Sequence, residues 1–159
     1  METTRHFTTT VYVVNEGATA LHRHDRLGIR VPPGGHVERD ELPHECAVRE
    51  VEEETGLAPT LLADRPAVDA PAGRALPEPA HVMLYDVDVF PDGRVAHQHV
   101  DHLYYATVPS RELDPDDGEK GAEAWEWYTR ADLRAGDLDP DLVQFGVEAI
   151  DAATEAESD

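Results

Sequence analysis

The sequence predicts an α/β (α+β) fold, with strands and helices intermixed along a single domain of residues 1–159. Two observations support this prediction. Segments rich in β-branched and aromatic residues recur between turn residues, as expected for strands. Two other segments lack strand alternation and are dominated by helix formers. Such mixtures form layers of helices on a sheet, and 159 residues suit one core of about 100–200 residues.

The first half of the chain predicts a strand hairpin, a short extended segment and a helix. Residues 6–14 and 18–24 form the expected hairpin, joined by the turn residues Asn15-Glu16-Gly17. Residues 26–31 are expected to be extended and to end at a Pro-Pro-Gly-Gly run. Residues 43–55 are expected to form a helix, because proline suits a first helical turn and a glycine follows the last residue.

The second half predicts strands separated by loops, and then a final helix. The expected order is loop 63–80 with at most one short strand, strand 81–90, turn 91–93, strand 97–108, loop 109–122 and strand 124–129. Asp139-Pro140 opens a helix with an apolar stripe. The acidic tail from about residue 154 is expected to fray.

The charge of the chain is strongly negative. Thirty-four acidic residues face 13 basic ones, the formal net charge is −21, and Lys120 is the only lysine. This composition resembles that of cytoplasmic proteins from salt-loving archaea and bacteria, in which concentrated salt screens the repulsion. It disfavours binding of long nucleic acid, because no basic patch is available for the phosphates.

The rest of the composition favours a cytoplasmic protein. No stretch approaches the roughly 18 consecutive apolar residues that a membrane helix needs. The first residues lack the basic-then-apolar pattern of a secretory signal. Cys46 is the only cysteine, so an internal disulfide and a Cys-rich zinc site are both excluded.

The predicted helix 43–55 carries a cluster of carboxylates. Glu50, Glu53 and Glu54 lie within about 100° of one another on one helix face, while Val51 and Thr55 lie on another. Carboxylates at these spacings repel each other, so a hard divalent cation such as Mg²⁺ or Mn²⁺ is a natural partner. The alternative is a solvated acidic face on an acidic protein.

A longer pattern surrounds this cluster. Gly35, five residues, Glu41, seven residues, Arg49-Glu50-Val51, one residue, Glu53-Glu54, one residue and Gly56-Leu57 resemble the Nudix box at every defining position. The match covers residues 35–57. It implies a Nudix-type α/β/α sandwich with a mixed β-sheet and a loop–helix–loop catalytic motif. One departure is Leu42, which stands where many members carry a helix-capping Ser or Thr.

The resemblance also implies roles for the residues of the box. The metal ligands would be Glu50, Glu53 and Glu54, with a backbone carbonyl near Gly35, and the metal would be Mg²⁺ or Mn²⁺. Glu41 would orient Arg49, and Glu53 would take part in catalysis. The implied reaction is hydrolysis of the pyrophosphate linkage of a nucleoside diphosphate linked to a group X.

The general base is open between a box glutamate and a later one. Many members carry a further glutamate on the loop before a Trp-containing strand. Here Glu119 and Glu123 precede Trp125-Glu126-Trp127. The candidates are therefore Glu53, Glu119 and Glu123, and of the two loop residues Glu123 is preferred.

Two groups outside the box are candidates for binding substrate. His97, His99 and Asp101 alternate, so they share one face of a strand. They would bind a transition metal such as Zn²⁺ or line a polar pocket, with His36 as a further candidate for the same region. A similar His-x-Asp strand in some Nudix members favours the pocket for His99 and Asp101.

Arginines before the box are the second group. Arg23, Arg26 and Arg30 would hold substrate phosphate, or they are surface residues at hairpin ends. Of these, Arg23 and Arg30 are the predicted substrate-binding pair.

The resemblance implies a small-molecule nucleotide as partner, and neither a membrane nor long nucleic acid. A MutT-like nucleoside triphosphate is the first expected substrate, and an ADP-ribose type the second. Many members are dimers, so a homodimer is compatible with the sequence. The alternative function is a non-catalytic Nudix-fold module that senses a nucleotide.

Overall fold

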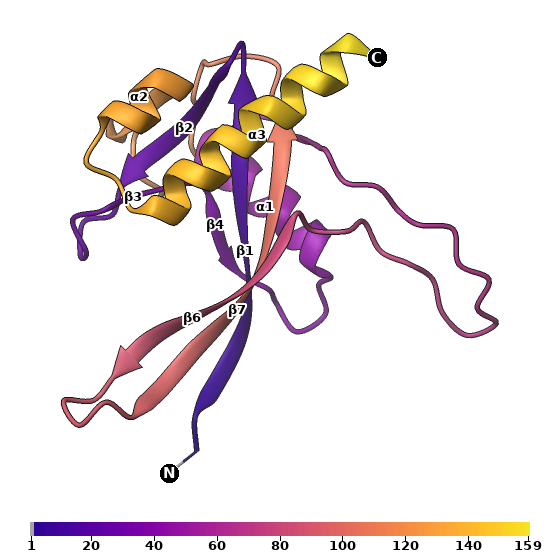
Figure 1. Cartoon of the computed structure of the whole chain (residues 1–159), viewed down its shortest axis with the longest axis vertical. Helices are drawn as coiled ribbons and strands as arrows, with labels where there is room; N and C mark the ends of the chain where they lie inside the picture. The colour runs from indigo at the N-terminus through magenta and orange to yellow at the C-terminus, as the bar shows by residue number, and fades with distance from the viewer. Residues whose placement is uncertain (1) are drawn as a thin grey trace.

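A mixed β-sheet of eight strands organises the part of the chain that the computed structural model describes, residues 2–159 (Figure 1). The strands are β1 (Thr4–Asn15), β2 (Ala18–Arg23), β3 (Arg30–Val31), β4 (Gly34–His36), β5 (Thr60–Leu61), β6 (His81–Val89), β7 (Val95–Thr107) and β8 (Trp125–Thr129). The long β1 is central, since it pairs in parallel with β7 and antiparallel with β2 and β4. β5 and β6 pair with β7, and β3 and β8 pair with β2.

Helices cover both faces of the sheet. In Figure 1, α3 (Pro140–Ser158) crosses in front of the sheet and α1 (Pro43–Thr55) lies behind it. Alternation along β1 divides the core between them, because successive side chains point to opposite faces. Val11 and Val13 pack with buried residues of α1, whereas Tyr12 and Val14 pack with α3 and with the short α2 (Arg130–Ala135). The predicted α/β (α+β) sandwich is confirmed.

The helix α1 has the predicted bounds, Pro43–Thr55. Gly56 ends α1 in a left-handed conformation, with φ of +73°, and donates its N–H to the carbonyl of Glu52 at 2.9 Å. Leu42 occupies the N-cap position and offers no side-chain oxygen. Another hydrogen bond stabilises the start of the helix: the side-chain carboxylate of Glu45 accepts the backbone N–H of Leu42 at 2.8 Å.

Four details differ from the sequence-based expectations. The extended segment 26–31 shrinks to β3, because residues 24–28 form a turn in which Gly28 has a φ of +67°. The loop before β6 is preceded by a short strand, β5. The helix α2 was not predicted, although Thr129 and Asp132 form the capping box that signals its start. The tail expected to fray instead continues α3 to Ser158.

An arm of three strands extends beyond the helices. The start of β1 and the distal halves of β6 and β7 form it, and residues 62–80 form a second projection (Figure 1). On the α1 side, the arm leaves Phe7 and Leu84 58% and 56% exposed, because α1 does not reach that far. On the opposite side, His6, His99 and Tyr85 lie side by side in register on β1, β7 and β6.

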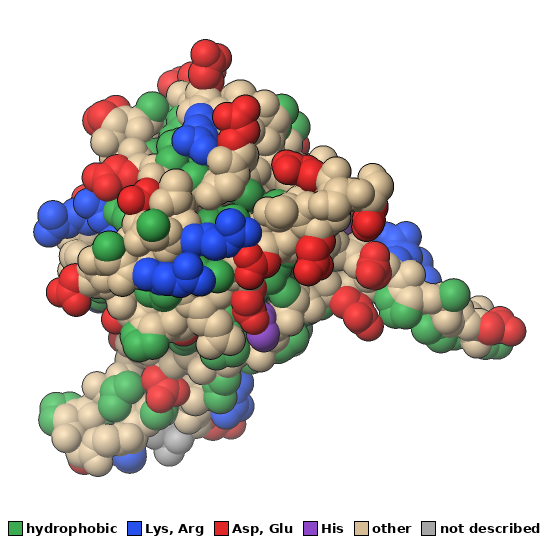
Figure 2. Space-filling model, turned by 45° about the horizontal axis from the view of Figure 1, so that its top comes forward, with side chains coloured by type: hydrophobic (Ala, Val, Ile, Leu, Met, Phe, Trp, Pro, Cys, Tyr) green, Lys and Arg blue, Asp and Glu red, His purple; other side chains and the backbone are tan. Residues whose placement is uncertain are grey.

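Acidic side chains are distributed over the whole face seen in Figure 2, with basic ones gathered at a few places between them. Within residues 2–159, no helix combines the length and the apolar character needed to cross a membrane. The distribution of charge agrees with the net charge of −21. Repulsion among these acidic side chains should make the stability of the fold depend on salt.

We expect molar KCl to stabilise the fold, because it screens repulsion among the acidic residues. The melting temperature should rise by about 5 °C or more between 0.1 M and 2 M KCl, which corresponds to roughly 2 kcal/mol for a domain of this size. Thermal melts followed by circular dichroism measure this, with sucrose as an uncharged control for general exclusion effects. A flat response to KCl would contradict the salt-adapted interpretation.

Candidate active site

One guanidinium organises the polar face of α1. Arg49 donates from Nε to Glu41 Oε2 at 2.7 Å and from Nη2 to Glu41 Oε1 at 2.9 Å. This two-pronged geometry fixes both side chains. The hydrogen bonds from Arg49 hold the pKa of Glu41 below its usual value against the opposing effect of desolvation. Glu41 therefore stays ionised and holds Arg49 in place, which is the contact implied by the resemblance.

The same guanidinium also contacts two of the predicted metal ligands. Arg49 Nη1 donates to Glu50 Oε1 at 3.0 Å and to Glu53 Oε2 at 3.3 Å. Glu50 is 13% exposed and Glu53 38% exposed, so one lies against the sheet and the other faces solvent. Arg49 thus orients the carboxylates of the helix and neutralises part of their charge.

The β4 strand fits closely against these carboxylates. A Cβ atom on Gly35 would overlap the carboxylate of Glu50, so only glycine leaves room for that side chain. Glu54 accepts a hydrogen bond from the backbone N–H of Gly34 at 3.2 Å. The predicted residues Gly35, Glu50, Glu53 and Glu54 are thereby brought together at one place, between α1 and β4.

Burial and mutual repulsion raise the pKa values of two carboxyl groups of the cluster. Burial, followed by repulsion from Glu50, raises the pKa of Glu54 to about 8. Burial also raises the pKa of Glu50, despite the attraction of Arg49. Clustered carboxyl groups with raised pKa values beside a cavity are typical of functional sites. Three carboxylates with backbone oxygens nearby form a hard donor set, which fits Mg²⁺ or Mn²⁺.

The raised pKa of Glu54 predicts that stability falls with pH when divalent cations are removed. A carboxyl whose pKa is raised from 4.5 to about 8 on folding stabilises the fold fully below pH 4.5. That contribution is lost as the pH rises through about 8. With EDTA present, the free energy of unfolding should therefore drop by roughly 2 kcal/mol between pH 6 and pH 8.5. Urea unfolding at the two pH values measures it.

Two controls test whether Glu54 is the cause. In the Glu54→Gln variant the drop should largely vanish, because the amide does not titrate. Mg²⁺ should also abolish the drop in the natural sequence, since cation binding favours the ionised carboxylate. An equal drop in the variant would assign the effect to another group.

A cavity of about 710 Å³ opens beside the cluster. Among the predicted residues, those that line it are Arg30, Gly35, His36, Glu54, His99, Asp101 and Glu119. The same wall includes His22, His24, Lys120, Tyr85, Trp125 and Asp141. Its size lies in the range of small-molecule sites. Arg23 is exposed and is not part of the lining, so its predicted contact with substrate has no support.

The structure favours Glu119 over Glu123. Glu119 lines the cavity and its charge contributes to the raised pKa values of Glu50 and Glu54. Glu123 is exposed in the short 3₁₀ turn Ala122–Ala124 and does not line the cavity. The predicted preference for Glu123 therefore gains no support from the structure, and residue spacing does not give the path of the loop.

The loop that carries Glu119 is anchored to the end of α1. Asp114 donates its N–H to the carbonyl of Thr55, and Asp116 donates to that of Glu53, both at 2.9 Å. These bonds satisfy carbonyls that a helix end leaves without partners. They also set the distance between the loop and the carboxylates of the helix.

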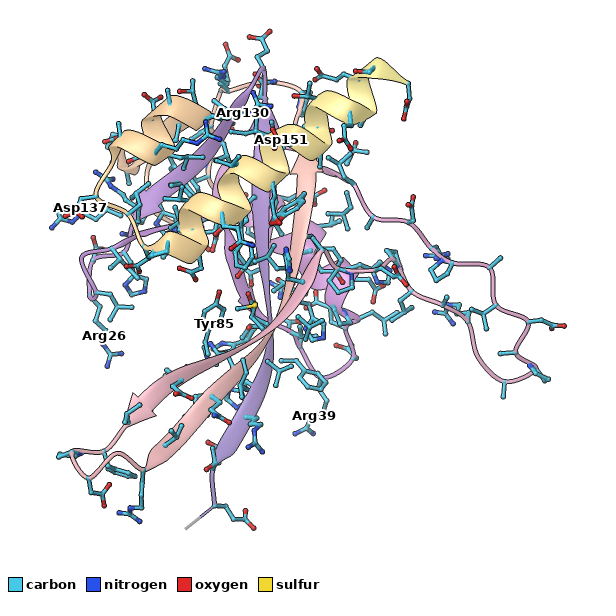
Figure 3. All side chains as sticks on the ribbon, viewed as in Figure 1. Arg26, Arg39, Tyr85, Arg130, Asp137 and Asp151 are labelled. Carbon is cyan, nitrogen blue, oxygen red and sulfur yellow. The ribbon has the colours of Figure 1, made fainter. Side chains whose placement is uncertain are left out.

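Several cavity residues were not predicted. Lys120 pairs with Asp25 at 3.0 Å and donates to the carbonyl of Arg23, so the only lysine sits at the cavity edge. Its isolation in an acidic sequence was a signal that could have been used. Tyr85 points from β6 toward the start of α3 in Figure 3 and donates to Asp141 Oδ2 at 3.1 Å. Nothing in the sequence pairs these two residues.

Asp101 is the most deeply buried acid of the cavity wall. It is 3% exposed and accepts a hydrogen bond from Thr8 Oγ1 at 2.8 Å through Oδ1. Its second oxygen, Oδ2, has no hydrogen-bond partner among residues 2–159. Burial raises the pKa of Asp101 above its ordinary value. A buried carboxyl with an unused oxygen suits recognition of a polar substrate group.

Comparison with known proteins places the chain in a family. The family description "NUDIX domain" matches residues 4–147. A hydrolase of the NUDIX family from Clostridium perfringens has 35% sequence identity and a TM-score of 0.78, covering 92% of this chain and 97% of its own. No curated protein sequence matches the chain.

Two more distant structures show the same fold. A MutT protein from Bacillus halodurans has 19% identity and a TM-score of 0.59, with 91% of this chain and 82% of that one covered. A MutT NUDIX hydrolase from Burkholderia pseudomallei has 23% identity and a TM-score of 0.54, with 91% and 97% covered. At these identities the likeness concerns the fold alone.

Proposed function

Because the chain belongs to the NUDIX family and is a pyrophosphohydrolase of its general kind, we propose that it is a metal-dependent hydrolase of a nucleoside diphosphate linked to X. Its substrate would be a nucleoside triphosphate, as for MutT-like enzymes, or a compound of the ADP-ribose type. The observation that carries the proposal is the cluster of Glu50, Glu53 and Glu54 on α1, in which Arg49 contacts Glu50 and Glu53 while Glu54 lines the cavity.

Glu50, Glu53 and Glu54 would hold Mg²⁺ or Mn²⁺. When bound, the cation would neutralise charge on the phosphoryl oxygens as water attacks phosphorus. Arg49 keeps two of the three carboxylates in position, and Glu41 keeps Arg49 in position. The support for these roles is the hydrogen-bond network together with the raised pKa of Glu54.

Glu119 is the proposed general base. It is exposed, lines the cavity and lies close enough to Glu50 and Glu54 to raise their pKa values. A carboxylate at the cavity wall can accept a proton from the attacking water. Glu53 is the alternative base, since it also faces solvent beside the cluster.

The rest of the cavity would hold the nucleotide. Arg30 and Lys120 bring positive charge to a wall otherwise rich in acids, which suits the phosphates. His22 and Trp125 lie with ring centroids 4.5 Å apart and offer aromatic surface for a base. His99 and Asp101 supply further polar groups in the lining of the cavity.

A hydrolysis screen tests the proposal. The purified full chain is assayed in molar KCl with Mg²⁺, then with Mn²⁺, against deoxynucleoside triphosphates including 8-oxo-dGTP, ADP-ribose, NADH, diadenosine polyphosphates and nucleotide sugars. We expect cation-dependent release of a nucleoside monophosphate from at least one of these compounds. EDTA and the Glu53→Gln variant should each abolish the release. Nucleotide binding without turnover in any condition would instead favour the non-catalytic sensing module.

A further inference from the structure

Three histidines from three strands meet on one face of the sheet. His6 of β1 lies opposite His99 of β7 in the parallel register. His36 of β4 pairs with Thr8 of β1, two residues from His6, so all three side chains point to the α3 side. The strands β4 and β7 are both hydrogen-bonded to β1, and this sheet therefore presents the rings from a rigid base.

The ring nitrogens converge. One nitrogen from each of His6, His36 and His99 can be chosen so that all lie within 4.8 Å of one another. Nε2 of His36 and Nε2 of His99 are 3.3 Å apart. In a tetrahedral zinc site with Zn–N distances of about 2.0–2.1 Å, ligand nitrogens lie about 3.3 Å from each other. Two of the three nitrogens already have that separation.

The rings have few other partners. Within residues 2–159, the only hydrogen bond that a ring nitrogen of His36 or His99 makes is the one between them, and His6 makes none. His97 differs, because its Nδ1 bonds Thr4 Oγ1 at 2.7 Å while its ring packs on His6 and His99. The nitrogens of His6, His36 and His99 are therefore directed at one another and not at carboxylates or backbone carbonyls of the described residues.

We propose that His6, His36 and His99 form a site for a transition-metal dication of the zinc class, separate from the glutamate cluster. Neutral imidazoles favour zinc, nickel and copper over magnesium, whose ligands are oxygens. The strongly negative chain attracts cations to its surface. The site does not depend on the proposed hydrolase function, because its ligands are imidazoles of three strands, whereas the glutamates belong to α1.

The position of the site suggests what it does. His36 and His99 line the same cavity as Glu54 and Glu119. Three protein ligands leave a fourth position of a tetrahedral zinc ion for water or for a ligand oxygen. That position can accept a phosphate oxygen of a molecule in the cavity. The cavity would then offer two cation sites of different chemistry, one built from carboxylates and one from imidazoles.

Equilibrium dialysis of the full chain tests the proposal without nucleotide or turnover. The chain is stripped with EDTA, which is then removed, and dialysed against Zn²⁺ or Co²⁺ with millimolar Mg²⁺ to occupy the carboxylate cluster. We expect one Zn²⁺ per chain, and with Co²⁺ the intense visible absorption of four-coordinate cobalt. His36→Gln and His99→Gln should weaken binding by at least about 100-fold, since each removes a direct ligand.

Matched variants distinguish zinc binding at these three histidines from binding at another histidine or at the glutamate cluster. His102→Gln alters a histidine on β7 that points to the opposite face and bonds the carbonyl of Thr8, and it should bind zinc normally. Glu53→Gln should also bind normally. His6 is exposed, so His6→Gln tests the site even if a variant of His36 or His99 fails to fold. Absence of zinc binding in the natural sequence, or equal loss in His102→Gln or Glu53→Gln, would overturn the proposal.

Discussion

Replacing Glu53 by glutamine is expected to lower turnover by about 10²–10⁴-fold while leaving the fold intact. The amide keeps the size of the side chain but removes its charge, so a divalent cation loses a ligand and the cluster loses a candidate base. Because Glu53 is 38% exposed and makes one 3.3 Å contact with Arg49, little packing is lost. Steady-state kinetics on the substrate found in the screen, with Mg²⁺ titrated at each step, measures the effect.

Glu52 provides the matched control. It is the neighbouring glutamate on the same helix, it is exposed, and among residues 2–159 its side chain makes no hydrogen bond or ion pair with the cluster. Glu52→Gln changes the net charge by the same amount, so it should keep turnover within about twofold, as expected for a surface substitution. If both variants lost activity equally, bulk charge rather than the cluster would explain the result. If Glu53→Gln stayed fully active, the assignment of the cluster as the catalytic centre would be wrong.

Structural features that are determined by residues close together in the sequence could be predicted. The helix 43–55 and its glycine end were predicted to the residue, because caps, periodicity and spacing all lie within one short segment. The pairing of Arg49 with Glu41 was implied by the resemblance to the Nudix box, whose residues lie in one short loop–helix segment. The resemblance also implied a close approach of the backbone at Gly35, and the structure places that glycine against Glu50.

Contacts between distant segments could not be predicted in this way. His6 was not singled out, because it joins the His36 and His99 cluster only through the parallel pairing of β1 with β7, 93 residues apart in the sequence. Alternation along a strand gives the face of each residue but not the register with another strand. The sequence could not decide between Glu119 and Glu123 for a similar reason, since the loop is placed by backbone bonds to α1.

Replacement of Gly56, the glycine that ends α1, is expected to have a large effect on stability. Gly56 has a φ of +73°, and a Cβ at this position would overlap the backbone carbonyl of Asp114. Alanine therefore has two costs: about 1–2 kcal/mol for the left-handed backbone and about 1–3 kcal/mol for forcing the loop away. We expect Gly56→Ala to lower the free energy of unfolding by about 2–5 kcal/mol.

The variant Gly93→Ala separates the backbone contribution to the loss of stability from the contribution of the steric overlap. Gly93 has a φ of +88° in the turn between β6 and β7, and a Cβ at this position would have no atom of residues 2–159 within 4 Å, so Gly93→Ala bears only the backbone cost. Urea unfolding of both variants should show the larger loss for Gly56→Ala. Turnover of folded Gly56→Ala should also fall, because Asp114 donates to Thr55 and the same loop leads to Glu119. Equal losses of stability in the two variants would mean that the loop yields without cost, and that its anchorage to α1 does not fix the position of Glu119.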